Sequence, residues 1–218
     1  MENNIILIIF QIAVLLGSVI IHEVSHGLMA LSLGDETAKD AGRLTLNPIS
    51  HIDLFGSIIL PLLLFVTHSP VILGWAKPVP YNPHALYKDY IYGPLKVALA
   101  GPLSNLALAF IFGLIIRLGS SFLSPVTLGF LSMIVFINCL LAIFNLIPIP
   151  PLDGSKILTI ILPPRYSLAL QNIGLGGIII LMIFIYYASD VIWLPAIMLF
   201  QLFAGSMGTQ AFMAIFGH

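Results

Sequence analysis

Six long apolar stretches dominate this sequence and constrain its fold more than any other feature. They are Ile5–Leu33, Leu54–Leu73, Gly93–Leu118, Val126–Ile147, Gln171–Ala188 and Val191–Phe216. Only 8% of the residues are charged, against about a quarter in soluble domains. So few charges cannot cover a globule with polar surface, and a single soluble domain is therefore excluded. We predict an all-α polytopic membrane protein with about five to six transmembrane helices.

The charge balance excludes further classes of protein. Lys and Arg number 8 and Asp and Glu number 9, so the chain has no basic excess for binding nucleic acid. High hydrophobicity with low charge excludes a disordered chain. The first apolar stretch lacks the basic start of a signal peptide, since the first basic residue is Lys39, and we interpret it as a retained helix. We expect one integral-membrane domain over residues 1–218, with C-terminal helices at about 171–216.

A candidate metal motif lies inside the first apolar stretch: His22-Glu23-Val24-Ser25-His26. On a helix, positions i and i+4 share one face, so both imidazoles can reach one ion at about 2.0–2.1 Å, which suits Zn²⁺. Glu23 would then sit beside the metal-bound water and take its proton as general base. Chance occurrence is the alternative, but unpaired polar groups in an apolar helix cost several kcal/mol. The pattern therefore favours a zinc site.

A catalytic zinc needs a third protein ligand and an open position. Asp153 is the best candidate, because it follows the fourth apolar stretch directly after a proline-rich segment that ends the helix. A helix cap or a surface turn is the alternative for this residue. The other candidates are His51, Asp53, His68, His84 and His218.

Two motifs together closely resemble the site-2 protease family of intramembrane zinc metalloproteases. They are the segment His22–Gly27, with the HExxH pattern, and the segment Asn145–Gly154, with the sequence NLIPIPPLDG. Ala100–Asn105 is similar to the family's Gly-Pro motif, and residues 42–53 and 74–80 resemble its compact prokaryotic branch. The resemblance covers residues 20–156, and the paired motifs are highly specific.

The resemblance implies a function and a set of roles. It implies one Zn²⁺ per chain, held by His22, His26 and Asp153, with Glu23 as general base. Asn145 would hold the substrate carbonyl or oxyanion near the metal. The catalytic core would span residues 5–160. Pro151 is an addition to the family pattern without consequence for the ligand, and the chain has no room for the PDZ or CBS domains of larger relatives.

Three further polar residues are candidates for the surroundings of the metal. His51 and Asn47 would line the site, bind substrate or orient a ligand histidine, or else act as turn and capping residues. For the neighbouring Asp53 we favour a capping role. Asn105, on one helical face with Gly101 and Ser104, would pack helices together or lie at the site.

The metal site constrains how the chain crosses the membrane. His26 and Asp153 lie near the ends of the first and fourth stretches, and these ends must be on the same side if both residues bind one ion. One intervening stretch must then fail to cross. Leu54–Leu73 is interrupted by Pro61, His68 and Pro70, so we predict a re-entrant segment at residues 54–73.

This topology can be tested against the distribution of basic residues. Seven of the eight fall on the active-site side, and only Arg117 falls opposite; the seven are Lys39, Arg43, Lys77, Lys88, Lys96, Lys156 and Arg165. By the positive-inside rule, the site faces the cytoplasm, at the plasma membrane of a prokaryote. The N-terminus would then lie outside and the C-terminus inside.

The resulting functional hypothesis is an intramembrane protease that cleaves transmembrane protein substrates within the lipid bilayer. A substrate helix must unwind, and we expect it to pair with a short membrane-associated strand near residues 42–47. The alternatives are a metal transporter and a catalytically inactive metal-binding membrane protein. The sequence does not determine the oligomeric state.

Overall fold

A computed structural model describes residues 2–59, 62–63, 66, 76–174 and 176–217 of the chain. Among the described residues, four helices are long and apolar enough to cross a membrane. They are α1 (Glu2–Ser32), α4 (Gly93–Gly119), α5 (Pro125–Asn145) and α9 (Asp190–Phe216). No described residue is in a β-strand. The prediction of an all-α polytopic membrane protein is therefore confirmed.

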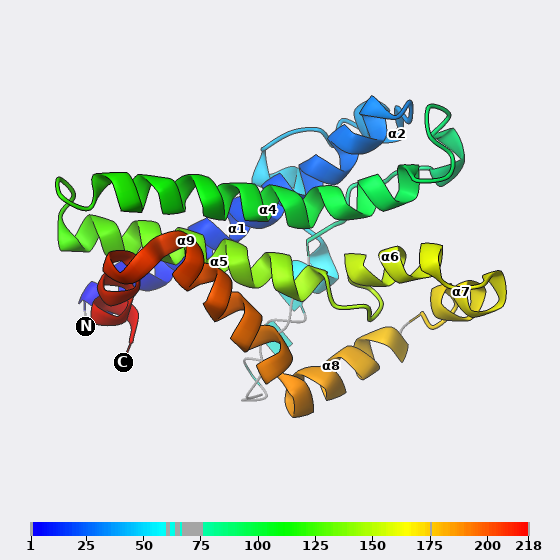
Figure 1. The fold of residues 1–218 in the computed structure, drawn as a ribbon. Helices are drawn as coiled ribbons and strands as arrows, with labels where there is room; N and C mark the ends of the chain where they lie inside the picture. The colour runs from blue at the N-terminus through cyan, green and yellow to red at the C-terminus, as the bar shows by residue number, and fades with distance from the viewer. Residues whose placement is uncertain (1, 60–61, 64–65, 67–75, 175, 218) are drawn as a thin grey trace.

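Helix α4 occupies the middle of the bundle and contacts α1, α5 and α9 (Figure 1). Helix α5 begins at a regular cap, where the Ser124 side chain accepts from the Thr127 N–H at 3.1 Å and proline follows at the first helical position. Where α4, α5 and α9 meet, the core consists of apolar and small side chains, namely Ala109, Ile116, Leu128, Val135, Cys139, Phe200, Ala204 and Ala211. Small residues let the three helices approach closely.

Helix α9 is broken near its middle, and an arginine from α4 compensates for the break. Gly205 has φ 68° and ψ −174°, a conformation in which the helical hydrogen-bond ladder cannot continue. Arg117 donates from Nε to the Phe203 carbonyl at 2.9 Å and from Nη2 to the Leu202 carbonyl at 2.5 Å. This charged side chain thus satisfies backbone groups that lipid would leave unpaired.

The two chain termini lie at the same end of the bundle (Figure 1). The Phe130 ring of α5 is 4.6 Å from the Phe10 ring of α1 and 6.4 Å from the Phe216 ring of α9. The expectation of termini on opposite sides is therefore wrong. The expectation failed because it counted the apolar stretch of α8 (Gly176–Ala188) as a membrane crossing. The 13 residues of α8 span about 20 Å, whereas a crossing needs about 30 Å.

The segment of residues 148–170 contains two short helices, α6 (Asp153–Ile161) and α7 (Pro164–Gln171). Each has only about two turns and follows a proline-rich run. The remaining short elements are α2 (Thr37–Asp40), the 3₁₀ turns Pro48–His51 and Pro83–Ala85, and a π-helical turn at Leu54–Ile59.

The predicted re-entrant segment lies mostly outside the described residues, which omit 60–61, 64–65 and 67–75.

The strand expected at residues 42–47 is not formed, and this prediction is wrong. The local backbone groups have other partners: the Arg43 N–H donates to the Ala38 carbonyl at 2.9 Å, and the His51 ring nitrogen Nε2 donates to the Thr45 carbonyl at 2.8 Å. A strand needs a neighbouring backbone to pair with. Here the backbone groups bond within a turn and to the His51 ring, so no strand pairing forms.

The segment 76–92 is held against the end of α1 by Asp35, which is 1% exposed. Its carboxylate accepts from the Asn82 N–H at 2.6 Å and the Thr37 N–H at 3.0 Å. Burial opposes ionisation, but the hydrogen bonds from Thr37 and Asn82 hold the pKa of Asp35 below its usual range. Leu86 packs beside this anchor against Ala30 and Leu33. The segment is thereby fixed over the active-site end of α1.

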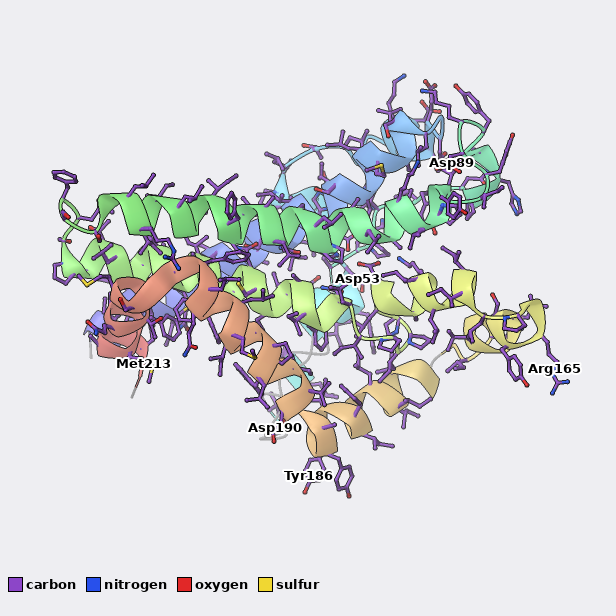
Figure 2. All side chains as sticks on the ribbon, viewed as in Figure 1. Asp53, Asp89, Arg165, Tyr186, Asp190 and Met213 are labelled. Carbon is purple, nitrogen blue, oxygen red and sulfur yellow. The ribbon has the colours of Figure 1, made fainter. Side chains whose placement is uncertain are left out.

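Charged residues gather at this same end of the molecule. Asp89 and Arg165 lie there, whereas Met213 lies at the opposite end (Figure 2). Lys88 donates from Nζ to the Ser32 carbonyl at 2.9 Å, and Lys96 pairs with Asp89 at 2.7 Å. These contacts agree with the predicted grouping of basic residues at one end of the bundle.

Candidate metal centre

Three predicted ligands meet between α1 and the first turn of α6. The Nε2 atoms of His22 and His26 each lie 3.0 Å from Oδ2 of Asp153. All three residues are buried, with whole-residue exposures of 5%, 6% and 5%. Among the described residues, this is the group of His, Cys, Asp and Glu side chains arranged to hold a metal ion. Residues separated by 127 and 131 positions in sequence are thus brought to one point.

The protonation of His26 follows from its neighbours. Its Nδ1 lies 2.6 Å from the carbonyl oxygen of Val97, which can only accept a hydrogen bond. Nδ1 must therefore carry the proton, and Nε2 of the neutral ring presents a lone pair. Val97 lies just over one turn before Pro102 on α4; the carbonyl that Pro102 leaves without its helical donor is that of the next residue, Ala98.

The protonation of His22 follows from a buried chain of amides. Asn138 donates from Nδ2 to the Ile134 carbonyl at 2.9 Å, which fixes its orientation and turns Oδ1 toward Asn105. Asn105 must then donate from Nδ2 to Asn138 at 2.9 Å and present Oδ1 to His22 Nδ1 at 2.6 Å. His22 Nδ1 therefore donates, and in the neutral ring Nε2, which lies 3.0 Å from Asp153 Oδ2, carries the lone pair.

The donor set fits a cation. Two imidazole nitrogens lie 3.0 Å from one carboxylate oxygen, and all three atoms lie within 4.8 Å of one another. Such a cluster of lone pairs attracts positive charge. Tetrahedral zinc with bonds of about 2.0–2.1 Å places its ligand atoms about 3.3 Å apart, close to the 3.0 Å between Asp153 Oδ2 and each histidine nitrogen. Two histidines and one carboxylate are a donor set of the kind that holds zinc in catalytic sites.

Two glycines permit the helices to approach the centre. A Cβ atom on Gly101 of α4 would clash with the Nε2 atoms of both His22 and His26. A Cβ on Gly154 would clash with the backbone carbonyls of Leu146 and Ile147, at the end of α5. Any side chain at Gly154 would therefore push the first turn of α6, and Asp153 with it, away from the histidines. These contacts give a physical reason for both motif glycines.

Glu23 is half-buried on the face of α1 next to the histidines, and its carboxylate Oε2 accepts from the Val79 N–H at 2.9 Å. Val79 stands between Pro78 and Pro80, so its N–H is the sole amide donor of that tripeptide. The segment is held by Arg43, which donates to the Lys77 carbonyl at 2.9 Å, and by the His51 carbonyl, which accepts from the Lys77 N–H at 2.9 Å. Glu23 is thus oriented by a braced loop.

Of the other residues predicted near the metal, some lie beside the cluster and some do not. Asn105 contacts His22 directly, in agreement with the interpretation that placed it at the site. His51 is buried and braces the loop over Glu23, while Asn47 is exposed and caps the turn at Pro48–His51 by accepting from the Ile49 N–H at 3.1 Å. Asn145, the last residue of α5, donates to the Leu141 carbonyl at 3.0 Å. The described third-ligand alternatives, His51, Asp53 and His84, lie outside the metal cluster; His68 and His218 are not among the described residues.

Sequence reasoning missed two contributors, Ser18 and Lys156. Ser18 accepts through Oγ from Asn138 Nδ2 at 2.9 Å, and Lys156 donates from Nζ to Asp153 Oδ1 at 2.9 Å. The available signal was helical spacing: Ser18 is four residues before His22, and Lys156 three after Asp153.

Replacing Asn105 with Leu is expected to lower zinc affinity about 10–100-fold, since the buried Nδ1–H of His22 loses its acceptor and the ring loses its orientation. Competition for zinc with a chromogenic chelator measures the change. Asn172→Ala, at an exposed asparagine, serves as the control. Equal zinc affinity of the parent and Asn105→Leu would contradict the orienting role.

Comparison with known proteins agrees with this geometry. Residues 10–186 match the model of peptidase family M50. The chain is 38% identical over 193 residues to "Putative zinc metalloprotease YwhC" of Bacillus subtilis (strain 168), covering 84% of each chain. It is 32% identical over 180 residues to "Putative zinc metalloprotease Rip2" of Mycolicibacterium smegmatis, covering 80% of this chain and 66% of that relative. No solved structure matches the chain. The chain therefore belongs to peptidase family M50, the site-2 protease family.

Proposed function

We propose that this integral-membrane member of a zinc metalloprotease family is an intramembrane endopeptidase. It would hydrolyse a peptide bond within or near a transmembrane segment of a membrane-protein substrate. The observation that carries the proposal is the convergence of His22, His26 and Asp153 at the end of a membrane helix, with the Glu23 carboxylate on the same helix. One zinc ion per chain is the expected cofactor.

Each residue has a distinct role in this proposal. His22, His26 and Asp153 would hold the zinc ion, which when bound would lower the pKa of water to about 7 and polarise a carbonyl. Glu23 accepts a proton at its carboxylate and later delivers it to the leaving amine. The Val79 N–H keeps one oxygen of that carboxylate in place. Asn145 would donate to the developing oxyanion, after its side chain leaves the Leu141 carbonyl.

The proposed orientation places the site toward the cytoplasm. Support comes from the gathering of basic residues at the metal end of the bundle, while Arg117 is engaged at the other end by the carbonyls of α9. In a prokaryote this membrane would be the plasma membrane. Water would enter from the cytoplasmic face, because hydrolysis needs a supply that lipid does not provide.

A reconstituted assay tests the proposal. Purified protein in lipid vesicles is mixed with a tagged single-span substrate, and cleavage is followed on gels with and without a zinc chelator. We expect cleavage to fall at least about 100-fold on chelation and to return when zinc is added back. Zinc flux into the vesicles, with intact substrate, would favour a metal transporter, and bound zinc with neither flux nor cleavage of a substrate panel would favour an inactive relative.

A further inference from the structure

The two oxygens of the Asp153 carboxylate have different partners. Oδ2 lies 3.0 Å from both histidine Nε2 atoms, whereas Oδ1 accepts from Lys156 Nζ at 2.9 Å. We propose that Lys156 is a positioning residue that holds Oδ1 and thereby restricts Asp153 to binding the metal through Oδ2. This inference rests on the metal site of the proposed function.

A carboxylate needs such a restraint because its two oxygens are chemically equivalent. Rotation about the terminal torsion of an aspartate is broad, so an unrestrained group can present either oxygen, or both, to an ion. A charge-assisted hydrogen bond to one oxygen selects a single orientation. Since partners of metal-binding side chains commonly fix ligand geometry in this way, the Lys156 contact preorganises the third ligand.

The contact is poorly explained as a helix-stabilising ion pair. Lys156 lies in the first turn of α6, where the partial positive charge of the helix N-terminus disfavours a cation. Exposed pairs of this spacing contribute only a few tenths of a kcal/mol. The Asp153 side chain is 7% exposed and that of Lys156 is 43% exposed, so the ammonium reaches from the water-facing rim to a buried carboxylate.

The turn that carries both Lys156 and Asp153 is held in place by its neighbours. Helix α6 packs against α4 and α7, and the start of α6 is fixed by the close approach of Gly154 to the Leu146 carbonyl. Lys156 and Asp153 therefore share one turn whose backbone is fixed by packing, with the lysine three residues after the aspartate and within reach of Oδ1.

The chain offers a matched control for this pair. Lys39 contacts Glu36 at 3.2 Å with the same i,i+3 spacing, but both side chains are more than half exposed. Glu36 is the N-cap of α2 and Lys39 lies within that helix. A Lys39→Met substitution removes an equivalent ion pair without touching the metal centre. It reports what the loss of such a pair does by itself.

The test compares zinc affinity of the full-length parent, Lys156→Met, Lys156→Arg and Lys39→Met, each measured in detergent by competition with a chromogenic chelator. We expect a 10–100-fold loss for Lys156→Met, a change within about threefold for Lys156→Arg, and parent affinity for Lys39→Met. Thermal unfolding of the zinc-free proteins is measured in parallel, and Lys156→Met is expected to unfold with the parent.

The outcomes separate this inference from the function on which it rests. Parent affinity in Lys156→Met would overturn the positioning role, and so would an equal loss in Lys39→Met. If the folded parent itself binds no zinc, the proposed metal site fails, and the inference fails with it. If the parent binds zinc but cleaves no substrate, only the protease assignment fails, and the affinities still decide the role of Lys156.

Discussion

Replacing Glu23 with Gln is expected to lower the rate of peptide cleavage by about 10²–10⁴-fold while leaving zinc binding intact. Gln retains an oxygen that can accept from the Val79 N–H, now 2.9 Å from Glu23, so the braced loop keeps its anchor. The amide cannot take up a proton at neutral pH, and general-base catalysis is lost. General acid–base catalysis contributes about 10²–10⁴-fold, so the cleavage rate should fall by that factor.

The measurement pairs a cleavage assay on a single-span substrate with zinc analysis of the same preparation. Glu36→Gln is the control, because Glu36 is an exposed carboxylate in an ion pair with Lys39. Cleavage near the parent rate by Glu23→Gln, with zinc bound, would remove Glu23 from the chemistry. Loss of zinc together with activity would instead assign Glu23 a structural part in the metal site.

The convergence of His22, His26 and Asp153 could be predicted because its constraints are local and chemical. His22 and His26 lie on one face of a helix by spacing alone, and polar groups in an apolar stretch need partners. Asp153 was found through a motif at the end of another helix. Asp153 is only 5% exposed, which excludes the surface-turn alternative. It lies in the first turn of α6, which explains why a helix cap was a reasonable competing interpretation.

The features that sequence did not reveal depend on contacts across the fold. The hydrogen bond between His22 and Asn105 joins residues 83 positions apart, and no pattern in either helix specifies its partner. The break at Gly205 is compensated by Arg117, in another helix. The strand predicted near residue 45 does not form, because local propensity cannot supply a neighbouring strand. Its backbone groups bond instead to the Ala38 carbonyl and to the His51 ring.

Replacing Gly101 with Ala is expected to eliminate zinc binding, although Gly101 donates no ligand. The added Cβ would lie 2.5 Å from His22 Nε2 and would also clash with His26 Nε2, so it would occupy the space of the ligand lone pairs. Either α4 moves away from α1 or both rings turn. Misplacement of reacting groups by about 1 Å can cost about 10²-fold, and both zinc affinity and cleavage should fall at least that far.

This substitution separates steric exclusion from helix destabilisation. Alanine is favoured over glycine inside a helix by about 1 kcal/mol, so α4 itself gains stability. Gly17→Ala, on α1, is the control, since a Cβ there has no neighbour within 4 Å. Zinc analysis should show parent content in Gly17→Ala and Glu23→Gln but none in Gly101→Ala. Zinc retained by Gly101→Ala would mean that α4 does not closely cover the histidine nitrogens, and the geometry of the centre derived above would be wrong.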